Sequence, residues 1–463
     1  MRAPLVAAVT ALSLACSALA VPLAERQIQT YLPPSQDPFY RPPASFASAQ
    51  NGAILASRKV GTYFDLLADA TYQVLYKTTA ATGEADATVA TLFRPKNALS
   101  PPRIMLLLSP TDSASVDCQT SYALVAHRNP FNATLTVATA VNAATNGLDL
   151  LAGLAKGWYV AVPDHEGSKA AFISGVTEAF AGLDGLRAML NHRETLPSAD
   201  GYKAVIHGYS GGGHASAWAT QFLPTYGSGL NVVAAAYGGV PIDLRVTFDH
   251  LDRNLFGSLA ISALQGMANA YPELQTWLDT AVSSAGRTAF QRAKTDCNSF
   301  VAAPFVDLDS LFTAGGAALE ETIPKKYFAI GSLGRPLDAP GASTNGQIAS
   351  IPVFQYHSRS DQIVSYDPVP SYFSAQCAGG ANLQLGTTLL SEHITALIAF
   401  LGDAYIFMNN AFEGRLGNRG CSQRNTIVAP LFSRAYIEAV GEQAWRQILG
   451  LNQRKVGGEE IHL

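Results

Sequence analysis

The chain has 463 residues, more than one hydrophobic core usually occupies, so we expect one large domain with an inserted subdomain, or two domains. Charged residues make up only 14% of the chain, against about 25% in an average protein, and the predicted surface is therefore mostly neutral and polar. The net charge of -4, with 31 lysines and arginines, argues against nucleic-acid binding and against an anionic membrane surface as partner.

Residues 1–20 are typical of a secretory signal peptide, with Arg2, an apolar stretch from Leu5 to Cys16, and small residues before a predicted cleavage after Ala20. A membrane anchor is the alternative, but the apolar stretch is shorter than the ~20 residues of a spanning helix, and no later segment is expected to span. Lipidation of Cys16 is disfavoured by the residues before it. Residues 21–50 form an N-terminal leader, Pro-rich from Leu32 to Ala44, that we expect to lie across the surface.

Four cysteines remain after the predicted cleavage: Cys118, Cys297, Cys377 and Cys421. An even number in a secreted chain favours two disulfides, and the sequence leaves all three pairings open. No pair has CxxC spacing, so we expect no structural zinc. Asn132, in Asn-Ala-Thr, is a glycosylation acceptor if the source is eukaryotic.

Residues 51–240 read as the first part of a sheet domain. A hairpin is predicted first, and four short apolar runs follow, with helix-like segments between most of them. Strands that are apolar on both faces and alternate with helices indicate a parallel sheet covered on both sides. The hairpin strands are Tyr72–Lys77 and Thr88–Phe93; the apolar runs are Ile104–Leu108, Trp158–Val162, Ala204–Ile206 and Val232–Tyr237; the helices include Leu148–Ala155 and Glu178–Leu190.

Residues 241–322 are helix-like almost throughout, for example at Leu259–Met267 and Leu274–Val282. An all-helical block that interrupts an alternating pattern predicts a cap, or lid, inserted into the sheet domain. Strand character returns at Tyr327–Ile330 and Ile351–Tyr356, so residues 323–463 are predicted to complete the sheet domain.

Gly208-Tyr209-Ser210-Gly211-Gly212 follows the run Ala204–Ile206 and precedes a helix-like stretch. This is the pattern of a nucleophile elbow, in which a serine on a sharp strand-to-helix turn projects its hydroxyl over the sheet edge. A Gly-rich surface loop is the alternative. The flanking strand and helix favour Ser210 as a nucleophile.

A serine hydroxyl needs a general base and an acid that orients it, and in this architecture the chain order is Ser, acid, His. Of the later histidines, His462 is close to the terminus, His250 lies in the predicted cap, and His357 precedes the best acid. His393, at the start of a helix-like stretch, is therefore the predicted base. His207 and His214 flank the elbow and are expected to be packing or polar neighbours.

Asp361, just after the strand Ile351–Tyr356, is the predicted acid, with Asp367 as runner-up. A turn-stabilising role is the alternative for Asp361. Glu392 is too close in sequence to His393 to orient it easily, and we interpret it as a helix-start carboxylate.

Donors for a tetrahedral oxyanion are expected from the Gly211 N–H and from the loop Ser109–Ser113 that follows an earlier strand. The His-Gly-Gly motif of many esterases is absent. The charged loop Pro163–Gly167 is not HExxH, and we interpret it as scaffolding and not as a metal site.

Several motifs in order carry a family resemblance from about Tyr72 onward: the elbow with Trp218, the Pro163-Asp164 loop, Leu183–Ala188, the cysteine positions, and the spacing of Asp361 and His393. Together they resemble the fungal secretory lipases of the lipase-A type. The resemblance implies an α/β-hydrolase core, a helical lid and a triad of Ser210, Asp361 and His393. It also implies an oxyanion hole from the N–H groups of Asp112 and Gly211, and the disulfides Cys118–Cys297 and Cys377–Cys421. One departure is the acid loop His357–Asp361, where relatives usually have a Gly-containing turn.

We therefore expect a secreted carboxylic-ester hydrolase that cleaves acyl esters such as triacylglycerols, without metal or organic cofactor, as a monomer that could work at a lipid–water interface. A deacylase of an acylated secondary metabolite, such as an acetylated terpenoid, is the main alternative. A hydrolase-fold binding module and a serine peptidase are disfavoured, the first by the intact Ser-Asp-His set and the second by the cap arrangement.

Overall fold

The computed structural model describes residues 31–62, 64–125, 147–297, 304–334, 348–426, 431–442 and 445–446. The predicted signal peptide, Asn132 and His462 lie outside the described residues. The described part of the leader, with short 3-10 turns η1 (Pro38–Tyr40) and η2 (Phe46–Ser48), packs the rings of Phe39, Tyr40 and Phe46 against the edge of a central sheet.

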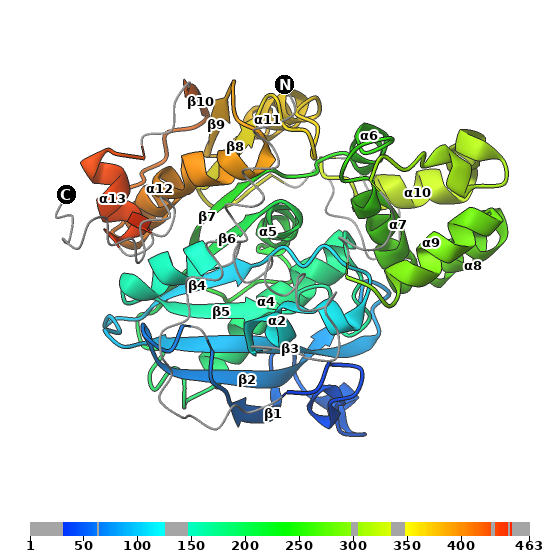
Figure 1. The fold of residues 1–463 in the computed structure, drawn as a ribbon. Helices are drawn as coiled ribbons and strands as arrows, with labels where there is room; N and C mark the ends of the chain where they lie inside the picture. Colours follow the sequence, from blue (N-terminus) through cyan, green and yellow to red (C-terminus); the bar gives the residue numbers. More distant parts are fainter. Residues whose placement is uncertain are drawn as a thin grey trace, which may run out of the picture.

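The described residues form a ten-stranded sheet that runs through the centre of the molecule (Figure 1). Its first pairings are antiparallel, from β1 to β5, and the pairings from β5 to β10 are all parallel. This confirms the predicted hairpin and the mostly parallel sheet. In spatial order the strands are β1 (Ile54–Lys59), β2 (Ala68–Thr79), β3 (Ala85–Pro95), β5 (Tyr159–Pro163), β4 (Arg103–Leu108), β6 (Lys203–Tyr209), β7 (Val232–Gly238), β8 (Val353–Ser358), β9 (Leu383–Thr388) and β10 (Ser422–Thr426).

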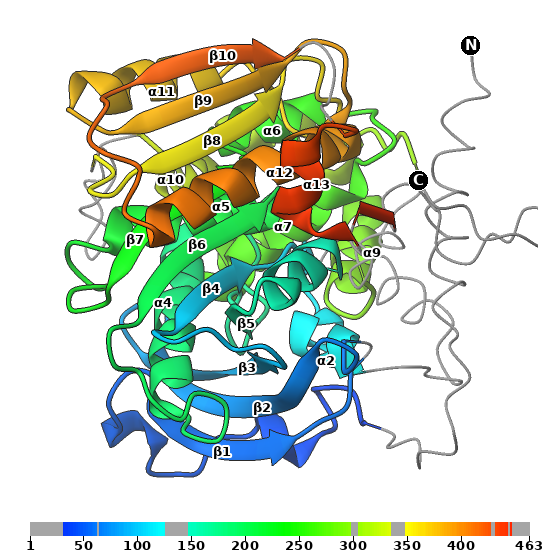
Figure 2. The ribbon, with the colours of Figure 1, turned by 90° about the vertical axis from the view of Figure 1, so that its left-hand side faces the viewer.

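Helices cover both faces of the sheet (Figure 2). One face packs against α4 (Gly175–Asn191), α5 (Gly211–Phe222) and α11 (Val369–Ala378). The other packs against the helix at 147–155 and α12 (His393–Phe412), on which α13 (Arg434–Val440) lies. The central strands are buried on both sides, which explains why their sequences are apolar without alternation.

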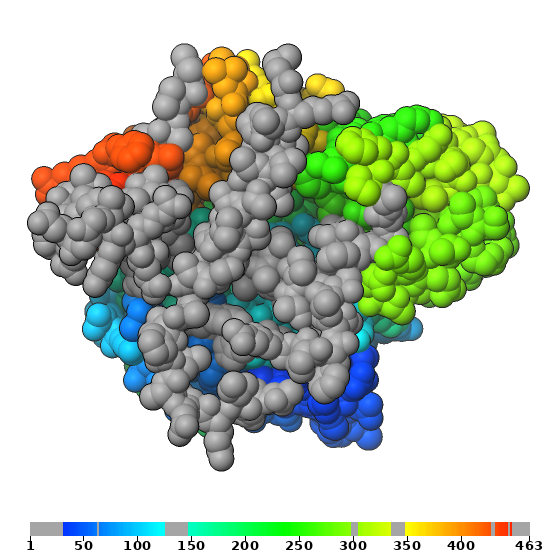
Figure 3. Space-filling view, viewed as in Figure 1, coloured from blue at the N-terminus to red at the C-terminus, as the bar shows by residue number. Residues whose placement is uncertain are grey.

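A helical insertion lies between β7 and β8 and has a hydrophobic core of its own. Figure 3 shows it as a lobe on one side of the molecule. It consists of α6 (Leu244–His250), α7 (Ser258–Ala270), α8 (Pro272–Ala281), α9 (Ser284–Ala293), η5 (Asp309–Leu311), η6 (Gly315–Glu320) and α10 (Thr322–Gly331).

The predicted strand at Tyr327–Ile330 is wrong, because these residues belong to α10. Pro324, Tyr327, Phe328 and Gly331 are buried at helical spacing, whereas Lys325 and Lys326 are exposed, so α10 is amphipathic. A four-residue apolar run does not distinguish a strand from a buried helix turn. The helical block therefore extends past residue 322 to Gly331.

Helix α12 is, by length and composition, apolar enough to cross a membrane, contrary to the expectation that no later segment would be. However, 61% of its most apolar window is buried inside the protein, against the sheet. It is therefore a core helix by its packing.

Two disulfides join segments that are distant in the chain. Cys118, at the end of η3 (Val116–Cys118), bonds to Cys297 after α9, and Cys377 in α11 bonds to Cys421 before β10. This is the pairing that the family resemblance implied. The first bond ties the sheet domain to the helical insertion.

We expect the secreted protein to contain no free thiol, and we expect Cys118→Ser with Cys297→Ser to lower the free energy of unfolding by roughly 2–5 kcal/mol, because a bond that spans 179 residues restricts the unfolded chain. Thiol titration of denatured, unreduced protein and chemical denaturation of the variant test this. Two or more thiol equivalents would contradict the disulfide assignment.

Candidate active site

Ser210 lies on a sharp turn between β6 and α5, with φ of 58° and ψ of -125°. A non-glycine residue is rarely found in this backbone region, and the small neighbours explain how it is held there. A Cβ on Gly208 would lie 2.3 Å from the carbonyl oxygen of Gly212, and a Cβ on Gly212 would lie 2.0 Å from that of Leu108. Glycine is therefore required at both positions, as the elbow pattern predicts.

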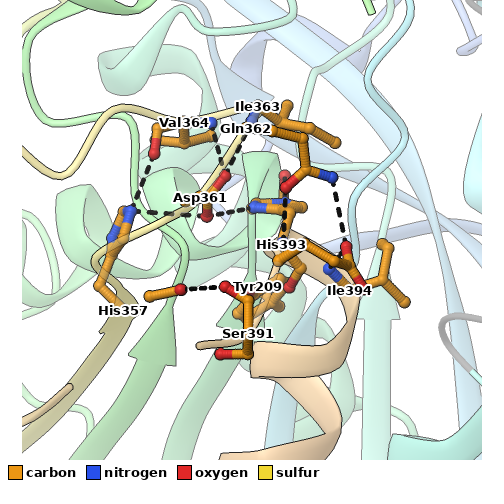
Figure 4. A network of polar contacts seen from close by, with 12 residues as sticks. Tyr209, His357, Asp361, Gln362, Ile363, Val364, Ser391, His393 and Ile394 are labelled. Atoms are coloured by element: carbon orange, nitrogen blue, oxygen red, sulfur yellow. Dashed lines mark hydrogen bonds and ion pairs between the residues drawn. The ribbon is translucent and has the colours of Figure 1, made fainter. Parts of the chain in front are cut away.

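The three residues predicted as a triad meet at the carboxyl edge of the sheet. The Nε2 atom of His393 lies 2.9 Å from Oγ of Ser210. Its Nδ1 atom lies 2.6 Å from Oδ2 of Asp361 (Figure 4). Both His393 and Asp361 are buried. Although 183 residues separate the serine from the histidine, the two hydrogen bonds link Ser210, His393 and Asp361 in one continuous network.

The Asp361 carboxylate is held by four groups. Oδ1 accepts the N–H groups of Ile363 and Val364 at 2.9 and 2.8 Å, and Oδ2 faces His393 and, at 3.5 Å, Nε2 of His357 (Figure 4). Burial alone would raise the pKa of Asp361, but the charge and hydrogen bond of His393, with His357 and the Val364 N–H, outweigh it, and the pKa lies below its usual value. The carboxylate is therefore ionised and can orient an imidazole.

Two side chains that sequence reasoning missed hold His393 in place. The Oε1 atom of Gln362 accepts the backbone N–H of His393 at 2.9 Å, and the hydroxyl of Tyr209 donates to its carbonyl oxygen at 2.6 Å. Their positions beside Asp361 and Ser210 in sequence are the only signal that could have marked them.

The alternative candidates have other partners. Glu392 caps α12 by accepting the N–H groups of Ile394 and Thr395, as expected of a helix-start carboxylate. The Nε2 atom of His250 lies 3.1 Å from the carbonyl oxygen of Asp361, closer to the site than the sequence indicated, and that of His357 lies 3.0 Å from the carbonyl oxygen of Val364. The backbone N–H of Asp367 donates to Oγ of Ser365 at 3.2 Å.

Asp112 and Gly211 lie together beside Ser210. A Cβ on Gly211 would lie 2.1 Å from Oδ1 of Asp112, and Asp112 has a positive φ of 53°. Burial raises the pKa of Asp112 to about 7, so its carboxyl group is largely neutral in mildly acidic solution. A neutral side chain here does not oppose negative charge that develops next to Gly211.

The loop Pro163–Gly167 is tied to its neighbours. Asp164 accepts the Ser121 N–H at 2.7 Å, and Nε2 of His165 lies 2.9 Å from the carbonyl oxygen of Ser109. Within the described ranges, no group of three or more His, Cys, Asp or Glu side chains could hold a metal ion.

An apolar pocket lies beside Ser210 and is lined largely by residues of the helical insertion. Asp112, Ser210 and Gly211 belong to its lining. The walls are almost entirely aliphatic and aromatic, and include Phe172, Ile173, Phe248, Leu264, Met267 and Phe328. A lining of this kind suits a hydrocarbon group and not a charged or peptide-like one.

A twisted, mostly parallel sheet with a serine on a strand–helix elbow, a histidine and a buried carboxylate defines the chain as an α/β-hydrolase. The family model for secretory lipases matches residues 131–419. The chain is 32% identical to lipase A of Moesziomyces aphidis, over 91% of this chain and 89% of that protein. It is 29% identical to a secreted triacylglycerol lipase of Malassezia furfur, over 92% and 85%.

The crystal structure of Candida antarctica lipase A in its closed state superposes with a TM-score of 0.80 at 29% identity, covering 91% of this chain and 96% of that one. A rice cell wall degrading esterase of Xanthomonas oryzae shares the fold, with a TM-score of 0.61 at 16% identity, covering 79% of this chain and 100% of that one. The chain belongs to the secretory lipase family, and it is a secreted carboxylic-ester hydrolase, as the sequence predicted.

Proposed function

We propose that the protein hydrolyses acyl esters such as triacylglycerols through an acyl-enzyme on Ser210, with the acyl chain in the apolar pocket. The observation that carries the proposal is that Ser210, hydrogen-bonded through His393 to Asp361, lines that pocket. The names of relatives from Malassezia, which are triacylglycerol lipases, support the substrate class. Such substrates gather at lipid–water interfaces, where we place the reaction.

In the first half-reaction, Oγ of Ser210 attacks the ester carbonyl while Nε2 of His393 takes its proton. Asp361 holds the imidazole by its Nδ1 atom and stabilises the imidazolium that forms. The N–H groups of Gly211 and Asp112 are proposed to donate to the oxyanion, where they would lower the barrier more than in water because the site is buried. His393 then returns the proton to the departing alcohol.

In the second half-reaction, water replaces the alcohol. His393 takes a proton from the water, the hydroxide attacks the acyl carbonyl, and His393 returns the proton to Ser210 as the fatty acid leaves. The same donors stabilise the second oxyanion.

Initial rates on p-nitrophenyl esters of increasing acyl length, with triglyceride emulsions alongside, test the substrate class. Longer acyl esters are expected to have higher kcat/KM values than acetate, because the pocket wall is apolar along its length. Activity confined to acetate esters would contradict the proposal and favour deacylation of a secondary metabolite.

We further propose that the helical insertion serves as a lid that shapes the acyl site. Leu259, Leu264 and Met267 of α7 line the pocket, whereas Leu274 and Leu278 of α8 pack inside the insertion. Helix α7 therefore contributes apolar side chains to the substrate pocket, whereas those of α8 pack in the insertion's own core.

Leu264→Trp is expected to shift the preferred ester to a shorter chain, with kcat/KM for long esters reduced about tenfold or more while acetate is still cleaved, because the indole fills pocket volume. Leu274→Trp is the matched control: the same change in the core of the insertion should lower the melting temperature without altering the length profile. Identical length profiles for wild type and Leu264→Trp would move the acyl site elsewhere.

A further inference from the structure

A buried pair of side chains, Glu178 of α4 and His214 of α5, connects the sheet domain with two walls of the pocket. Oε2 of Glu178 lies 2.6 Å from Nδ1 of His214, and both side chains are fully buried. The two helices lie side by side (Figure 1). His214 is one turn after Ser210, and its N–H donates to the Ser210 carbonyl oxygen at 2.9 Å.

The other oxygen of Glu178 holds a strained segment of the pocket wall. Oε1 accepts the backbone N–H of Ile173 at 2.9 Å. Ile173 has a positive φ of 65°, a conformation that a β-branched residue adopts only when its surroundings impose it. Ile173 and its neighbour Phe172 both line the pocket.

The far side of His214 reaches the helical insertion. Its Nε2 atom lies 3.0 Å from the carbonyl oxygen of Gly331, at the end of α10, the helix that carries Phe328 into the pocket. Nε1 of Trp218 lies 2.9 Å from the same nitrogen, which either donates to Gly331 or accepts from Trp218. The pair therefore contacts the Phe172–Ile173 segment on one side and α10 on the other.

Helix α7 of the insertion packs closely against the other side of the Phe172–Ile173 segment. A Cβ on Gly266 of α7 would lie 2.6 Å from both the nitrogen and the oxygen of Phe172. The position of the Phe172–Ile173 segment is thus set between α7 and the Glu178 carboxylate, and a change at either side has to move it.

We propose that Glu178 and His214 are positioning residues that set acyl-chain selectivity by holding the Phe172–Ile173 segment and the end of α10 at the pocket. This inference rests on the proposed acyl site. Neither side chain touches the substrate. They act through the wall segments they hold, which an acetate ester contacts less than a long acyl chain does.

The test compares Glu178→Ala with Asp149→Ala. Asp149 forms the same kind of buried pair, 2.8 Å from Nε2 of His207, but on the opposite face of the sheet and away from the pocket lining. Both changes leave a buried histidine without its carboxylate and should lower the melting temperature. Only Glu178→Ala should alter selectivity.

The readout is the ratio of kcat/KM for p-nitrophenyl octanoate to that for the acetate, at a mildly acidic and a mildly alkaline pH. We expect the ratio to fall roughly tenfold in Glu178→Ala, mainly through KM for octanoate, and to stay at the wild-type value in Asp149→Ala. Burial and the charge of Glu178 raise the pKa of Asp112, and His393 lowers it, so Glu178→Ala also changes the charge beside Ser210. That change affects the hydrolysis of both esters equally, and it therefore cancels in the ratio of their kcat/KM values.

Two further variants keep the test decisive if Glu178→Ala does not fold. Glu178→Gln keeps one acceptor oxygen and should show a smaller decrease, and Gly266→Ala should lower the ratio from the opposite side by displacing Phe172. An unchanged ratio in the folded variants, or an equal decrease in Asp149→Ala, would overturn the inference. A wild-type enzyme with no preference for octanoate would instead contradict the proposed acyl site itself.

Discussion

Replacing Ser210 with alanine is expected to lower kcat for p-nitrophenyl butyrate by on the order of a millionfold, because no acyl-enzyme can form without Oγ. The fold should persist, since alanine fits wherever serine does and the Ser210 backbone bonds to Gly238 and His214 remain. Initial rates on purified protein and a thermal melt measure the two effects.

Ser216→Ala is the matched control for that substitution. Ser216 is a buried serine on the same helix, but its hydroxyl donates to the carbonyl oxygen of Gly212 at 2.7 Å and not to a histidine. Its loss should leave activity within a small factor of wild type. Activity near the wild-type level in folded Ser210→Ala would refute the assignment of the nucleophile.

His393→Ala is expected to lose nearly as much activity as Ser210→Ala, and the double variant should lose little more. The two residues act as a unit: without the base, Oγ of Ser210 stays protonated, and without Oγ, the base has no proton to take. The measurement is kcat for the two single variants and the double variant.

His250→Ala provides the control, because His250 also lies beside Asp361 but contacts only its carbonyl oxygen at 3.1 Å. We expect it to keep most of the wild-type activity. Independent, multiplying losses at Ser210 and His393, or an inactive His250→Ala with an active His393→Ala, would show that the base is another residue.

The sheet and the elbow could be predicted because their signals are local. Strands β4 to β8 are buried on both faces, so each appears in sequence as an apolar run, and Gly208 and Gly212 are required by contacts within the turn itself or with the adjacent strand. The edge strands β1 and β10 do not appear in the sequence as apolar runs. Strand β10 is polar and mostly exposed, and β1 is only partly buried, so pairing with a neighbour decides their conformation.

By itself the sequence determined the class of chemistry: a serine on a strand–helix turn, followed in chain order by Asp361 and His393. The sequence selected His393 by chain order and elimination, but only the tertiary structure gives the distances: His250 and His357 also lie beside Asp361, and Nε2 of His393 lies 2.9 Å from Oγ of Ser210. The tertiary structure also decided which side chains form the pocket. Phe172 and Ile173 belong to no periodic pattern, and their backbone conformation depends on contacts with the Glu178 carboxylate and with Gly266 of α7, which the sequence did not indicate.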